Sequence, residues 1–134
     1  EAARALKRDF VFTARAENFL HGRPDLDDTV RRLQAFEAAG ADVLYAPGLT
    51  DIDTVRAVCS AVTKPVNVLA VPRFSVAELA AAGARRISLG SKLTNYTFGM
   101  LEKAARQILE EGSFAFADEA MPFARLQQMF AVPE

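Results

Sequence analysis

The feature of this sequence that most constrains its fold is the alternation of two hydrophobic periods. Segments with apolar residues at helical spacing alternate with short apolar runs rich in β-forming residues. The runs predict strands at Phe10–Ala14, Val43–Tyr45, Pro65–Leu69 and Arg86–Leu89. The periodic segments predict helices at Asp25–Ala39 and Asp53–Val62, and a third between Ser75 and Gly83. Strand–helix alternation without a hairpin signal is typical of a parallel sheet with right-handed crossovers.

Turn chemistry supports this α/β interpretation. The sequence Ala-Ala-Gly-Ala-Asp at 38–42 is echoed by Ala-Ala-Gly-Ala-Arg at 81–85. In both places a helix ends on glycine and a strand begins almost at once, as in short αβ turns. Ser75 and Glu78 have the spacing of a capping box at a helix start. The pattern predicts a half barrel of four β/α units over residues 1–90.

The chain has 134 residues, whereas a whole β/α barrel needs roughly 250. It begins with neither an initiator methionine nor a signal-peptide pattern, so we expect it to be the inside of a longer chain. The formal net charge is −1 and there is no basic run, which disfavours nucleic acid or a membrane surface as partner.

Cys59, the one cysteine, lies on an apolar helix face and is expected to be a packed thiol. A single cysteine is consistent with a reducing compartment, and the expected location is cytoplasmic.

Residues 91–134 predict a helix at Lys92–Glu111 that ends at Gly112, followed by a tail rich in phenylalanine and methionine. The wide apolar surface of this segment should dock onto another surface. That surface is either its own domain or a neighbouring subunit, which would make the protein a homo-oligomer.

Ligands of parallel β/α folds bind at the carboxyl ends of the strands. Arg15 follows the first predicted strand, and its planar guanidinium suits a carboxylate or phosphonate. The alternative is a structural ion pair with Glu17 or another acidic residue. Asn67 is a polar residue in an otherwise apolar strand, so it either bonds a neighbouring loop or meets a ligand.

Other residues near predicted strand ends have weaker support. Tyr45 could be a core aromatic with its hydroxyl at the rim. His21 lies in a polar loop, where solvation is commoner than catalysis. Gly90 follows the last predicted strand. No glycine-rich phosphate motif, zinc spacing or carboxylate cluster is present, so no metal site is predicted within the chain.

Three motifs resemble the isocitrate lyase/phosphoenolpyruvate mutase superfamily. They are Thr-Ala-Arg-Ala-Glu-Asn at 13–18, Ala-Gly-Ala-Asp-Val-Leu-Tyr-Ala-Pro-Gly at 39–48 and Lys-Pro-Val-Asn-Val-Leu-Ala at 64–70. The resemblance continues through 75–79 and 85–90, covers nearly the whole chain, and is strongest to bacterial members similar to 2-methylisocitrate lyase or carboxyphosphonoenolpyruvate mutase. It implies strands five to eight of a (β/α)8 TIM barrel plus C-terminal helices.

The resemblance implies an enzyme that forms or cleaves a bond next to a 2-oxo-acid enolate with Mg2+. Arg15 matches the arginine that grips the substrate's acidic group, and Asn67 matches a substrate-facing asparagine. Glu17 stands where the family often has aspartate. The Mg2+ ligands would lie in the first half of the barrel. The helix at Lys92–Glu111 corresponds to one that subunits commonly exchange.

Pro47 departs from the family pattern. It stands where the methylisocitrate-cleaving branch has a glutamate and the phosphonate mutases a histidine, which argues against both specific activities. We therefore expect part of a Mg2+-dependent C–C bond lyase or decarboxylase acting on a small 2-oxo or 2-hydroxy di- or tricarboxylate. The expected catalytic residues are Arg15 and Asn67, with Glu17, Tyr45 and Gly90 also binding substrate. The alternatives are a phosphonate-forming mutase and a non-catalytic half barrel that pairs with another chain.

Overall fold

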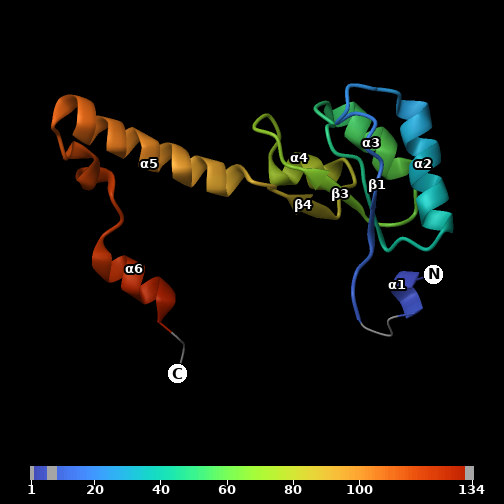
Figure 1. Ribbon diagram of the computed structural model, residues 1–134. Coiled ribbons are helices and arrows are strands. Elements are labelled where there is room, and N and C mark those ends of the chain that lie inside the picture. The colour runs from blue at the N-terminus through green and yellow to red at the C-terminus, as the bar shows by residue number, and fades with distance from the viewer. Residues whose placement is uncertain (1, 6–8, 132–134) are drawn as a thin grey trace. The chain divides into compact units, whose positions relative to one another are not determined.

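The computed structural model describes residues 2–5 and 9–131. The chain divides into two compact units, Glu1–Gly90 and Ser91–Glu134. The first unit contains a four-stranded parallel sheet in the order β1-β2-β3-β4 (Figure 1). Its strands are β1 (Thr13–Arg15), β2 (Val43–Tyr45), β3 (Val66–Leu69) and β4 (Arg86–Ser88). The predicted α/β fold with a parallel sheet is therefore confirmed.

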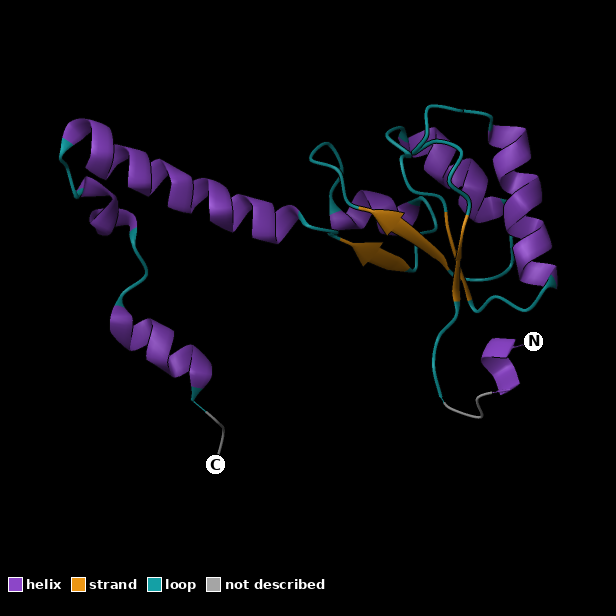
Figure 2. Cartoon of the chain, viewed as in Figure 1, coloured by secondary structure: helices purple, strands orange, loops and turns teal. Residues whose placement is uncertain are grey.

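Three helices connect consecutive strands, as Figure 2 shows. They are α2 (Leu26–Ala38), α3 (Ile52–Ser60) and α4 (Val76–Ala81), and a short helix α1 (Ala2–Ala5) precedes them. The side chains of Asp25, Asp51 and Ser75 accept hydrogen bonds from the first turns of α2, α3 and α4. Ser75 and Glu78 form the predicted capping box, which fixes where α4 begins.

The two faces of the sheet differ in chemistry because side chains alternate along each strand. One face carries apolar residues that pack with the helices: Ala14, Leu44, Val66, Val68 and Ile87. Leu33 of α2, Val58 of α3 and Leu79 of α4 are buried in the same core. The other side, called here the open face, carries Thr13, Arg15, Val43, Tyr45, Asn67, Leu69, Arg86 and Ser88.

The first strand begins later than predicted, and much of the apolar run before it is exposed. β1 begins at Thr13 and includes Arg15, whereas Phe10, Val11 and Phe12 are 38%, 64% and 44% exposed. Among the described residues, β1 pairs with β2 alone, so no strand covers the other side of this run. The backbone of Phe12 is nevertheless fixed, because its N–H donates to the Asp42 carboxylate at 2.8 Å.

The second unit contains α5 (Lys92–Glu111), a 3-10 helix η1 (Ala115–Glu119) and α6 (Phe123–Phe130). α5 has its predicted bounds, and Gly112 ends it with a φ of +63°. The tail beyond Gly112 contains the two short helices η1 and α6, of which α6 is amphipathic. No residue of these three elements is buried. Among the described residues, no helix is long and apolar enough to cross a membrane.

Candidate functional site

Four residues, one from each strand, form a row across the open face. Arg15 is in register with Tyr45, Tyr45 with Asn67, and Asn67 with Arg86. Side chains in register on parallel strands lie on the same face. The row brings together three of the predicted site residues and adds Arg86.

Arg15 is held from two sides. Its Nε donates to Oε1 of Glu17 at 2.6 Å, and its guanidinium carbon lies 5.0 Å from the centre of the Tyr45 ring. A cation within about 6 Å of an aromatic face is attracted by the ring quadrupole. Arg15 is the last residue of β1 rather than the residue after the strand, and its side chain is 50% exposed. The guanidinium is therefore oriented while remaining accessible.

Glu17 also approaches His21 in the loop after β1. Its second oxygen, Oε2, lies 3.8 Å from Nε2 of His21. The ion pair with Glu17, which the sequence offered as an alternative to anion binding by Arg15, is therefore present. It does not exclude anion binding, because it uses only the Nε of the guanidinium.

Asn67 is the buried polar residue of the open face. It is 3% exposed, and its Nδ2 donates to the Ser88 hydroxyl at 3.1 Å. Its Oδ1 is buried and has no hydrogen-bond partner among the described residues. A buried acceptor without a partner costs about 1–3 kcal/mol, so the atom should meet a donor in the functional protein. Asn67 bonds the adjacent strand and not a neighbouring loop.

Glycines shape the loops at the same edge of the sheet. Gly48, after β2, has a φ of +94°, and a Cβ there would lie 2.8 Å from the backbone N of Leu20. The close approach joins the loop after β2 to the loop that carries Glu17 and His21. Gly90, after β4, has a φ of +58°, and a Cβ there would lie 3.4 Å from Leu69.

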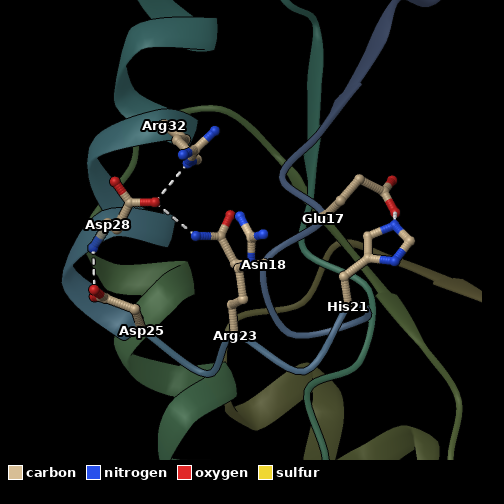
Figure 3. Close-up of a pocket in the computed structure, with 7 residues that line it drawn as sticks. All are labelled: Glu17, Asn18, His21, Arg23, Asp25, Asp28 and Arg32. Carbon is tan, nitrogen blue, oxygen red and sulfur yellow. Dashed lines mark hydrogen bonds and ion pairs between the residues drawn. The ribbon is translucent and has the colours of Figure 1, made fainter.

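A depression of about 510 Å³ lies between the loop after β1 and the start of α2 (Figure 3). Its lining residues are Glu17, Asn18, His21, Arg23, Asp25, Asp28 and Arg32. Among these residues, Asp28 accepts hydrogen bonds from Arg32 Nε at 2.6 Å and Asn18 Nδ2 at 2.7 Å. The bonds from Arg32 and Asn18 lower the pKa of the Asp28 carboxyl, and the charge of Arg31 contributes. The Asp28 carboxylate therefore links the loop after β1, through Asn18, to α2.

The residues that the structure describes do not form a metal site. Among those the structure describes, no group of three or more His, Cys, Asp or Glu side chains is placed to hold a metal ion. Within the described ranges, Glu17 is the carboxylate beside the Arg15 guanidinium, and it is paired with that arginine. Cys59 packs against the core, as expected, and burial raises the pKa of its thiol.

Sequence reasoning missed Arg86, Asp28 and Arg32. Arg86 carried a usable signal, since it lies two residues before Ser88 and shares a sheet face with it. Its Nη1 reaches the Thr13 hydroxyl of β1 at a long 3.5 Å. Asp28 and Arg32 have the i,i+4 spacing of a surface helix pair, which is too common to identify a site.

The geometry defines a class of protein: a β/α fold of the TIM-barrel type with polar side chains at the carboxyl ends of its strands. More specifically, the chain belongs to the phosphoenolpyruvate phosphomutase family, whose model matches residues 1–109.

Solved structures agree with this assignment. A candidate lyase/mutase from Burkholderia cenocepacia is 48% identical with a TM-score of 0.90, over 99% of this chain and 49% of its own. A phosphoenolpyruvate phosphomutase from Streptomyces platensis is 29% identical with a TM-score of 0.79, over 96% of this chain and 48% of its own. A 2,3-dimethylmalate lyase, described as a PEP mutase/isocitrate lyase superfamily member, is 22% identical with a TM-score of 0.77, over 96% of this chain and 47% of its own. At that identity the likeness shows the fold alone. The resemblance inferred from the sequence motifs is confirmed.

The chain spans about half the length of its relatives. An uncharacterized protein of Mycobacterium tuberculosis is 30% identical over 116 residues, which cover 85% of this chain and 43% of the relative. This chain therefore carries one part of the family's fold.

Proposed function

We propose that the chain contributes the substrate-anion side of an active site that cleaves or forms a carbon–carbon bond next to a 2-oxo-acid enolate. The substrate would be a small 2-oxo or 2-hydroxy di- or tricarboxylate. The observation that carries the proposal is Arg15, an accessible guanidinium at the end of a strand, oriented by Glu17 and Tyr45. Such a group suits a carboxylate that does not itself react.

In this mechanism Arg15 binds the remote carboxylate and fixes the position of the bond to be broken. Orientation of this kind lowers the barrier because the substrate is held near its reactive geometry. Asn67, whose Oδ1 lacks a partner among the described residues, would accept a hydrogen bond from a donor within the barrel. Gly90 and Tyr45 would complete the wall of the site.

The proposal does not place a metal ion on the described residues of this chain. The described residues offer no carboxylate cluster for Mg2+. We therefore infer that any Mg2+ ligands are supplied by other residues.

A phosphonate-forming mutase is the second candidate, and the family match and the likeness to a phosphoenolpyruvate phosphomutase favour it. The protein, expressed from its complete reading frame, should be assayed with Mg2+ against two substrate sets. Release of an oxo acid from hydroxy dicarboxylates supports the lyase, whereas formation of a P–C bond from phosphoenolpyruvate supports the mutase. Activity with neither set contradicts both, and a non-catalytic half barrel would then remain.

We also propose that α5 packs on a second copy of this protein. The helix has no buried residue, and Phe98, Leu101 and Leu109 are 64%, 62% and 83% exposed. These three residues lie on one side of the helix at helical spacing. An apolar strip of this kind is typical of an obligate interface.

A further inference from the structure

We propose that Glu17 and Tyr45 are positioning residues that turn Arg15 into a preformed fork for the remote carboxylate of the substrate. This inference rests on the proposed function, because it concerns how the same site selects a dicarboxylate. Glu17 and Tyr45 would act through Arg15, by fixing the orientation of its guanidinium.

The first support is that Glu17 occupies one donor of the Arg15 guanidinium and leaves the others available. Its Nε is bound to Glu17 Oε1 at 2.6 Å. Neither Nη group makes a hydrogen bond to any residue in the described part of the chain. The two Nη groups form the end of a planar guanidinium, which matches the two oxygens of a carboxylate. Binding through Nε thus leaves the end that suits a ligand free.

The second support is the Tyr45 ring. The guanidinium carbon lies 5.0 Å from its centroid, which limits rotation of the guanidinium plane. The backbone also aligns the two strands at this point, since Ala16 N–H donates to Tyr45 O at 2.8 Å. Glu17 and Tyr45 therefore restrain the guanidinium in two different directions.

The third support is that Glu17 is itself restrained. Its Oε2 lies 3.8 Å from His21 Nε2, and Gly48 packs directly against the backbone of Phe19 and Leu20 in the same loop. An arginine held in this way loses little further rotamer freedom when it binds a ligand. The pair with Glu17 is therefore a device for orientation, since an exposed ion pair adds little stability by itself.

The test uses malate and lactate, two 2-hydroxy acids that differ by one remote carboxylate. Their dissociation constants are measured by calorimetry with Mg2+ on the protein expressed from its complete reading frame. The ratio of the lactate constant to the malate constant reports the contribution of the remote carboxylate. Glu17→Ala and Tyr45→Leu should each lower this ratio about 2- to 10-fold. Tyr45→Phe keeps the ring and should preserve the ratio.

Asp53→Asn is the matched control, because Asp53 pairs with Arg56 on the surface of α3. It should leave the ratio unchanged. An unchanged ratio in both Glu17→Ala and Tyr45→Leu, with their melting temperatures showing folded protein, overturns the positioning roles and leaves the proposed function intact. If the unsubstituted protein binds neither acid, the proposed function fails and this inference fails with it.

Discussion

At the scale of single residues, the proposed function depends on Arg15. Lysine keeps the positive charge but lacks the planar fork, so a purely Coulombic role would survive Arg15→Lys. Loss of one charge-assisted hydrogen bond and of orientation should cost about 2–4 kcal/mol, or roughly 30- to 1,000-fold in kcat/KM. The measurement is kcat/KM together with the melting temperature, on a substrate found by the screen above.

Arg56→Lys provides the comparison, since Arg56 makes a surface ion pair with Asp53 on α3. It should leave kcat/KM unchanged. If Arg15→Lys lowers the melting temperature and kcat/KM stays the same, Arg15 is a structural residue and not part of the site.

Gly48 tests how tightly the loops around Arg15 are joined. Gly48→Ala would place a methyl group 2.8 Å from Leu20 N, at a φ of +94°. Gly40→Ala has nearly the same backbone requirement, with a φ of +98° but no atom within 4 Å of its Cβ. Each substitution should cost about 1–3 kcal/mol for the backbone conformation, and Gly48→Ala should cost more because of the collision. Urea denaturation of both variants measures the difference; equal losses would show that the loop contact is loose.

Glu37 gives a stability effect that depends on pH. Hydrogen bonds from the Thr63 hydroxyl and from the N–H groups of Thr63 and Lys64 lower the pKa of the Glu37 carboxyl. A lowered folded-state pKa means that its stabilisation is complete above the unfolded value, about 4.3, and is lost as pH falls through the lower folded value.

Glu37→Gln should therefore melt below the unsubstituted protein at neutral pH, and the gap should close as the solution is acidified below about pH 4. Thermal melts of both proteins across this range measure it. A gap that stays constant from neutral to acid would mean that the ionised carboxylate contributes nothing.

At the scale of elements, local patterns predicted the β/α units well. β2 and α5 have the bounds that the sequence predicted, and the predicted capping box at Ser75 is present. These features depend on short-range sequence. The exposure of Phe10–Phe12 could not be predicted, because it depends on which strand neighbours β1, and that is a property of the whole sheet.

The candidate site was predictable in part for the same reason. Arg15, Tyr45 and Asn67 were found because each follows or interrupts an apolar run. These three residues share one row with Arg86 because of the strand register, and a local sequence pattern does not reveal register. The hydrogen bond from Asn67 to Ser88 likewise required the pairing of β3 with β4.

The element with the clearest test is α5. Replacing Leu101 and Ile108 by aspartate puts two charges on its apolar side, where burial in an interface would cost several kcal/mol. We expect the double variant to dissociate, as measured by light scattering. Asn95→Asp with Gly99→Asp adds the same charge on the polar side of the helix and should leave the mass unchanged.

If the Leu101→Asp/Ile108→Asp protein stays folded at its original mass, α5 is not at a subunit interface. The C-terminal unit would then have to bury its apolar strip against its own protomer.

At the scale of the whole molecule, two kinds of chemistry are expected of this family: binding of the substrate anion and binding of a metal ion. The open face of the sheet offers a positioned guanidinium and a buried amide oxygen without a partner among the described residues. The same described residues provide no metal-binding group. We therefore propose that this chain recognises the substrate anion and that the metal is held by other residues.

Calorimetric titration of the 134-residue chain with Mg2+ and oxalate, a mimic of the enolate, tests this division directly. We predict no saturable binding, because the described residues form no carboxylate cluster that could hold the cation. Saturable binding at micromolar concentration would contradict it, since a metal site would then exist within these residues.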